Sequence, residues 1–140
     1  MKPIITAHDL EEVRSLPRAF VFIYVNWAIQ ARHSDIAFRD FVAAWALTKP
    51  DCSIPVYRVD LSDQEGEVWK CIRNWLREED QPYDQLTYGG SGALLWIRSG
   101  AVVASVPYVA AVERAKLMAV TKSIFECRVA PGAASDRDGS

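Results

Sequence analysis

The side chains best suited to covalent or metal chemistry are three cysteines and two histidines, and they are widely separated. Cys52, Cys71 and Cys127 form no Cys-x-x-Cys pair, which excludes the usual zinc ribbon and dithiol redox patterns. His8 and His33 are single and distant from each other in the chain. We therefore expect no metal site and no bound cofactor.

The three cysteines differ in their expected surroundings. Cys71 and Cys127 fall on or beside the apolar faces of predicted helices, where cysteine is commonly a small buried residue. Cys52 follows Pro50 and Asp51 in a predicted loop, and we expect it to be the exposed thiol. No basic residue is predicted beside it, so it is weak evidence for catalysis by a thiolate.

Length and composition favour one soluble domain with a substantial core. The chain has 140 residues, of which 50% are hydrophobic and 24% charged. Sixteen basic and 18 acidic residues give a net charge of −2, which argues against a nucleic-acid-binding protein. No apolar run reaches the ~20 residues of a membrane span, and the first residues lack a secretion signal. We predict a cytoplasmic protein.

Strand-like and helix-like segments must position whatever site exists, and they alternate along the chain. A capping box at Thr6–Asp9 opens a short helix that Pro17 closes, and a second capping box, Ser62–Glu65, opens another helix. We expect strands at 19–25, 54–61, 93–98 and 101–106, further helices at 30–47 and 108–127, and a loop at 81–92. Residues 129–140 have nothing to bury, so we expect a domain over 1–128 and a disordered tail. This order predicts an α/β fold with a mixed central sheet and helices on both faces.

Specific residues within this order resemble the thioredoxin family. That family has a W-C-G-P-C-K segment where a buried strand leads into a long helix, and Trp27-Ala28-Ile29-Gln30-Ala31-Arg32 occupies that place here. Arg58 stands at the usual lysine of the next strand, and the hairpin at 94–103 is similar to the family's L-L-L-F-K-N-G-x-x-V. The resemblance covers roughly residues 4–126 and implies a thioredoxin-like fold.

The departures from the family pattern fall on the redox machinery. Ala28 and Ala31 replace the two cysteines, and Phe22 replaces a buried acid of the preceding strand. Gly92 aligns with the family's cis-proline, and the residue pattern does not decide whether the Ser91–Gly92 bond is cis. Disulfide exchange needs an attacking thiolate and a resolving thiol, and a methyl group can act as neither. We expect no thiol-disulfide oxidoreductase activity.

The resemblance therefore implies a binding or scaffolding module. We expect Trp27, Ala28, Ile29, Gln30 and Ala31, with Ser91 and Gly92, to form a groove for a protein or an extended peptide. One alternative is a divergent thiol-disulfide or glutathione-dependent enzyme that uses Cys52 or Cys71. Another is a homodimer built through residues 81–90 and the tryptophan-bearing third helix.

Overall fold

A mixed five-stranded sheet in the order β1-β3-β2-β4-β5 forms the centre of the molecule in the computed structural model, which describes residues 1–63, 66–87 and 91–125. The strands are β1 (Lys2–Ile4), β2 (Arg18–Tyr24), β3 (Val56–Asp60), β4 (Ala93–Arg98) and β5 (Ala101–Val106). Strands β1, β3 and β2 run parallel, whereas β4 is antiparallel to β2 and to β5.

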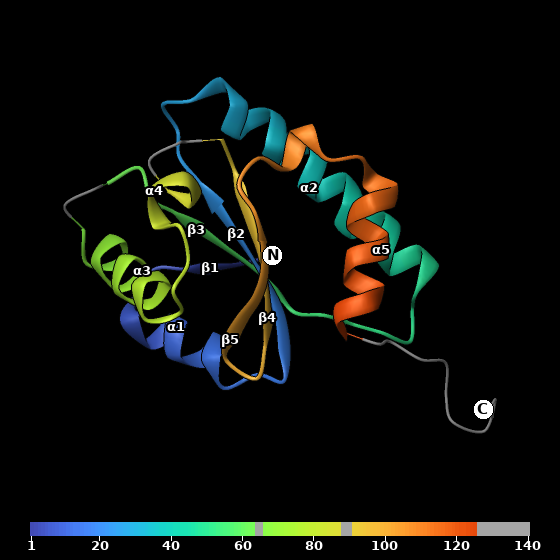
Figure 1. The fold of residues 1–140 in the computed structure, drawn as a ribbon, viewed down its shortest axis with the longest axis horizontal. Coiled ribbons are helices and arrows are strands. Elements are labelled where there is room, and N and C mark those ends of the chain that lie inside the picture. Colours follow the sequence, from blue (N-terminus) through green and yellow to red (C-terminus); the bar gives the residue numbers. More distant parts are fainter. Residues whose placement is uncertain (64–65, 88–90, 126–140) are drawn as a thin grey trace.

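Helices cover both faces of this sheet (Figure 1), as the sequence predicts. On one face lie α1 (Ala7–Arg14), α3 (Glu67–Glu78) and the short α4 (Tyr83–Leu86). On the other lie α2 (Ile29–Thr48) and α5 (Arg114–Phe125), preceded by the 3-10 helix η1 (Val109–Ala111). Within the described ranges, no helix combines the length and apolar character needed to cross a membrane.

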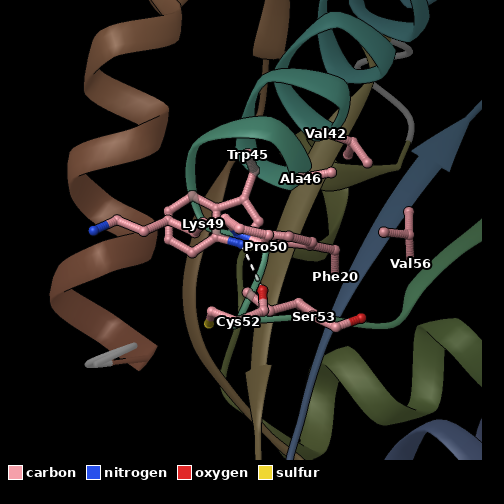
Figure 2. A pocket seen from close by; sticks show the side chains of 10 residues that line it. Phe20, Val42, Trp45, Ala46, Lys49, Pro50, Cys52, Ser53 and Val56 are labelled. Carbon is pink, nitrogen blue, oxygen red and sulfur yellow. Dashed lines mark hydrogen bonds between the residues drawn. The ribbon is translucent and has the colours of Figure 1, made fainter. Parts of the chain in front are cut away.

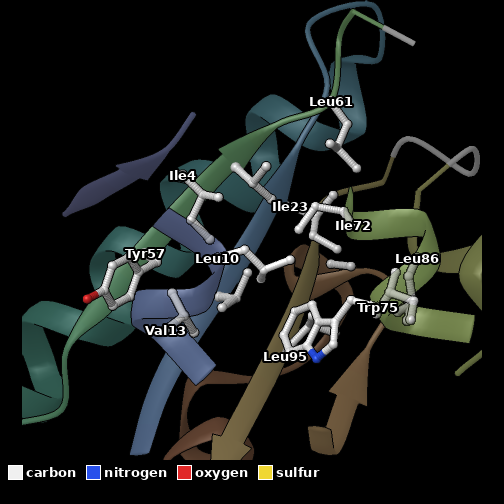
Figure 3. Close-up of a cluster of buried hydrophobic side chains, with 14 of the residues drawn as sticks. Ile4, Leu10, Val13, Ile23, Tyr57, Leu61, Ile72, Trp75, Leu86 and Leu95 are labelled. Carbon is white, nitrogen blue, oxygen red and sulfur yellow. The ribbon is translucent and has the colours of Figure 1, made fainter. Parts of the chain in front are cut away.

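Strand β2 lies in the middle of the sheet and contributes to both apolar layers. Because successive side chains of a strand point to opposite faces, Val21 and Ile23 pack towards α1 and α3, while Phe20 and Phe22 pack towards α2 and α5. Figure 3 shows the first of these layers, in which Trp75 of α3 lies close to β4. A continuous apolar run in the sequence is the pattern expected of a strand covered on both sides.

Local capping signals were correct at one helix and wrong at another. At α1, the Thr6 hydroxyl accepts from the Asp9 backbone N–H, and the Asp9 carboxylate accepts from the Thr6 N–H. The capping box predicted at Ser62–Glu65 does not open α3, which begins at Glu67 after Gly66 as N-cap. The Ser62 hydroxyl instead accepts from the backbone N–H of Asn26, which ties two loops together.

Two further predictions need correction. The segment expected to be a loop contains α4, where the Thr87 N–H and hydroxyl both donate to the Tyr83 carbonyl. The final helix is not continuous from residue 108, because η1 and an extended Val112 precede α5. Cys127, the domain boundary at 128 and the predicted tail at 129–140 lie outside the described residues, as do Gln64 and Glu65.

Both edge strands of the sheet are poor templates for another strand. Strand β1 has only three residues, and Pro3 has no N–H to donate. In β5, the Val102 N–H donates to the Glu79 carboxylate at 2.8 Å, and the register against β4 shifts between Trp96 and Ile97. Short strands, prolines, charged caps and bulges are the devices by which proteins protect sheet edges.

Candidate functional site

The predicted site lies where β2 ends and α2 begins. Trp27 lies in the turn between them and is 48% exposed. Ile29 is the first residue of α2 and is 62% exposed, and Gln30 beside it is also exposed. The segment from Trp27 to Arg32 therefore leads into a long helix, as the resemblance implied, and it presents two large apolar side chains to solvent.

The two alanines occupy different environments at this helix start. Ala28 is the N-cap residue of α2, and its methyl group makes no capping hydrogen bond. Ala31 is fully buried against the core between β2 and α3. Neither side chain carries an electron pair or an exchangeable proton, so neither can attack a disulfide.

Ser34, one helical turn after Ala31, joins this helix start to the Ser91–Gly92 segment. Its buried hydroxyl donates to the Ser91 carbonyl at 2.6 Å and accepts from the Ala110 N–H at 3.1 Å. The Gly92 carbonyl accepts from the Val109 N–H at 3.0 Å. Ser34 thus ties α2, three residues after Ala31, to the Ser91–Gly92 segment, and sequence reasoning missed this residue.

Gly92 has a backbone conformation that disfavours other residues. Its φ is +88°, and the described chain has no cis peptide bond, so the Ser91–Gly92 bond is trans. A β-carbon on Gly92 would also lie 2.4 Å from the Ser34 Cβ. Gly92, which the resemblance aligns with the family's cis-proline, thus allows α2 to approach closely.

The Phe22 side chain is part of the core. It is fully buried, and its ring stacks on Phe38 of α2 with centroids 4.9 Å apart. Arg58 of β3 lies directly beside it in the parallel pairing. Phe22, which the resemblance aligns with the family's buried acid, thus contributes apolar packing that stabilises the fold by about 1.5–3 kcal/mol relative to an exposed ring.

A carboxylate does lie near Arg58, but it comes from a helix rather than from β2. Asp35 of α2 has one carboxylate oxygen 3.5 Å from the Arg58 Nε and the other 3.1 Å from the Arg39 Nε. The Arg58 guanidinium also lies 4.2 Å from the centre of the Tyr24 ring. Asp35 is thus held by two cations and serves as an ion-pair partner. Its only signal in the sequence was its helical spacing from Arg39.

The prediction for Cys52 was wrong. Cys52 is only 4% exposed and is disulfide-bonded, so it offers no free thiol. Figure 2 shows why: the Trp45 indole N–H donates to the Cys52 carbonyl at 3.0 Å and draws the loop onto the end of α2. An apolar cavity of about 120 Å³ lies there, near the end of α2 far from Trp27.

Cys71 is a free, half-buried cysteine on α3 and packs beside the core, which agrees with its predicted structural role. The prediction for Cys127 lies outside the described residues. Among the residues that the structure describes, no three of the types histidine, cysteine, aspartate and glutamate cluster as a metal site would require.

Comparisons with known proteins identify the fold by structure but not by sequence. No sequence-family model matches the chain, and no curated protein matches it in sequence. Thioredoxin O2 from Arabidopsis thaliana has a similar structure, with a TM-score of 0.57 and 12% identity over 89% of this chain and 93% of that one. The chain has a thioredoxin fold.

Two further solved thioredoxins agree with the thioredoxin fold over nearly their whole length. Plasmodium falciparum thioredoxin matches with a TM-score of 0.55 and 10% identity, over 89% of this chain and 99% of that one. Fasciola hepatica thioredoxin matches with a TM-score of 0.52 and 17% identity, over 91% and 100%. The likeness confirms the predicted thioredoxin-like architecture.

Proposed function

We propose that this protein is a redox-inactive binding module with a thioredoxin fold. Its binding surface comprises Trp27, Ala28, Ile29 and Gln30 with Ser91, and its partner is an extended segment of another protein. Ala31 and Gly92, which were expected to line the groove, are buried beneath this surface. The observation that carries the proposal is the combination at the start of α2. Two alanines stand at the aligned dithiol positions, while Trp27 and Ile29 beside them remain exposed.

The absence of a dithiol removes disulfide exchange at this surface. Exchange proceeds through a mixed disulfide, which needs one thiolate to form it and a second thiol to release it. Ala28 and Ala31 supply neither, and Ser34, the hydroxyl nearest to Ala31 along the helix, is fully engaged with Ser91 and Ala110. The surface at the start of α2 can therefore bind a partner but cannot exchange disulfides with it.

The exposed side chains favour recognition of a partner by apolar contact. Tryptophan is enriched among the residues that contribute most to protein interfaces, because its large ring is rigid and loses little entropy on binding. The carbonyls of Ser91 and Gly92 already accept hydrogen bonds within the chain. We therefore expect the partner to be held by the side chains of Trp27 and Ile29 more than by strand addition.

A thiol enzyme remains the rival hypothesis and now depends on Cys71. Cys52 is disulfide-bonded, whereas Cys71 is free and half-buried. Reduction of insulin or of a small disulfide by the purified protein, lost in Cys71→Ser, would establish the enzyme and overturn the binding module. We expect no turnover in either protein.

The binding surface can be tested by identifying what touches it. A photo-crosslinking amino acid at Gln30 is used in the native host, and the crosslinked peptide is sequenced and synthesised. We expect Trp27→Ala to weaken the Kd for that peptide at least about tenfold. Val103→Ala, an exposed apolar side chain on β5, serves as the control and should leave the Kd unchanged. Equal affinity of Trp27→Ala and the wild type would reject this surface.

A further inference from the structure

The outer face of α2 carries large apolar side chains that the fold does not use. Ile29, Ile36 and Leu47 are 62%, 68% and 85% exposed. Single exposed apolar residues are normal on a soluble protein. Three along one face of one helix are unusual, since a surface helix normally turns polar residues to solvent.

Helical geometry places these residues on one line. Ile36 and Leu47 follow Ile29 by about two and five turns at 3.6 residues per turn, so all three point the same way. Phe38 follows Ile29 by about two and a half turns and points into the core. The exposed stripe is thus opposite the buried face, and Ala43 and Asp40 lie along it.

We propose that the part of this stripe from Ile29 to Ala43 binds the same part of a second copy of the chain, with the two α2 helices antiparallel. Leu47 lies beyond the paired segment. With the two-fold axis at Ile36, this side chain packs against Ile36 of the second copy. Ile29 then lies opposite Ala43 of the second copy, a large residue facing a small one. The arrangement is isologous, so each of these contacts occurs twice except the one on the axis.

Charge complementarity favours a second copy in this orientation. In the antiparallel register, Arg32 lies opposite Asp40 of the second copy, which gives two ion pairs in the dimer. A parallel register would instead place Arg32 against Arg32 and Asp40 against Asp40. Within the described part of the chain, Arg32 is exposed and has no carboxylate at salt-bridge distance. Asp40 pairs with Arg114 at 3.1 Å but is still 59% exposed.

This inference goes beyond the proposed binding function and uses a different set of residues. Only Ile29 belongs to both surfaces, because Trp27 precedes α2. It also differs from a homodimer through residues 81–90 and the third helix, of which residues 88–90 lie outside the described chain. The protected edges of β1 and β5 make pairing of strands between copies a poor alternative.

The oligomeric state tests the stripe directly by light scattering after size exclusion and by sedimentation equilibrium. We expect the wild type to dimerise and Ile36→Asp, which places two carboxylates on the axis, to be monomeric. Ile5→Asp replaces an isoleucine that is equally exposed, at 66%, but lies before α1, and it should still dimerise. A wild type that is monomeric up to about 0.5 mM overturns the proposal, as does an Ile36→Asp variant that dimerises.

A charge exchange tests the antiparallel register. Arg32→Asp and Asp40→Arg should each weaken the dimer about tenfold, since opposed like charges replace two ion pairs. The double variant should restore it. Weakening without restoration in the double variant overturns the register. Trp27→Ala should leave the dimer intact, so failure of the peptide-binding proposal is distinguishable from failure of this one.

Discussion

A β-carbon placed on Gly92 would lie 2.4 Å from the β-carbon of Ser34. This close approach joins α2 to the segment before β4, and the Ser34 hydroxyl completes it by binding the Ser91 carbonyl and the Ala110 N–H. The two parts of the proposed binding surface are therefore held by one buried serine and one glycine, neither of which needs to contact a partner.

Gly92→Ala should destabilise the protein by at least about 2 kcal/mol, because it combines a positive φ with overpacking against Ser34. The free energy of unfolding in urea measures the effect. Gly66→Ala is the control: a β-carbon there meets a flexible Asp63 carboxylate at 3.1 Å. Its cost should be smaller, at most about 1 kcal/mol. Equal costs at the two glycines would contradict the role of Gly92.

Ser34→Ala should cost about 1–3 kcal/mol, since it leaves the part-buried Ser91 carbonyl and Ala110 N–H without their partner. Ser105→Ala, which removes a longer hydrogen bond of 3.2 Å to Gln81 at the sheet edge, should cost less. Hydrogen exchange provides a second measurement: the Ala110 amide should lose protection in Ser34→Ala. Unchanged protection would show that another group satisfies this amide.

The double variant Ala28→Cys/Ala31→Cys should acquire disulfide reductase activity that the wild type lacks. Position 28 is the N-cap of a long helix, where the helix N-terminus lowers the pKa of a thiol, and position 31 lies one turn further along. Insulin reduction measures the gain, with each single variant as control. A folded double variant that forms no disulfide between positions 28 and 31 would refute their assignment as the dithiol positions.

Cysteine labelling without reductant should modify Cys71 and spare Cys52, because Cys71 is free and Cys52 is disulfide-bonded. Alkylation followed by mass spectrometry, before and after reduction, measures both. Disulfides persist mainly in oxidising compartments. The same measurement on protein taken directly from its host therefore also tests the predicted cytoplasmic location.

Stability should fall in acid, and Asp9 should contribute to the loss. Hydrogen bonds from the Ile5 and Thr6 backbone N–H groups hold the pKa of Asp9 below its ordinary value of 3.8. A carboxyl with a lowered pKa in the folded state stabilises the fold above its unfolded pKa, and this contribution disappears as the pH falls through the folded pKa. Asp9→Asn should flatten the decline of Tm below about pH 4. Asp51→Asn in an exposed loop should keep the wild-type decline.

Most of the architecture could be predicted from local sequence. The run at 19–25 indicated a buried central strand, and Ser99-Gly100 between two strand-like segments indicated the hairpin; both residues adopt positive φ, as such a turn requires. These features depend on near neighbours in the chain. For the same reason the helix after Trp27 was predictable.

The errors concern residues whose environment depends on distant parts of the chain. Cys52 follows Pro50 and Asp51, a pattern typical of an exposed loop, but the Trp45 indole N–H binds its carbonyl and the residue is buried. Ser34 has the sequence context of an ordinary helix serine. Its hydroxyl has two partners only because the fold places the Ser91 carbonyl and the Ala110 N–H beside it. Ser62 has the sequence of a helix cap but binds Asn26, 36 positions earlier.

The protected ends of the sheet have a consequence for how this protein behaves when crowded. One outer strand has three residues and a proline, and the other is bulged and has one of its N–H groups bound by Glu79, so both are poor templates for cross-β growth. Concentrated or freshly synthesised molecules should therefore resist fibril formation even with exposed isoleucines and a leucine on their surface.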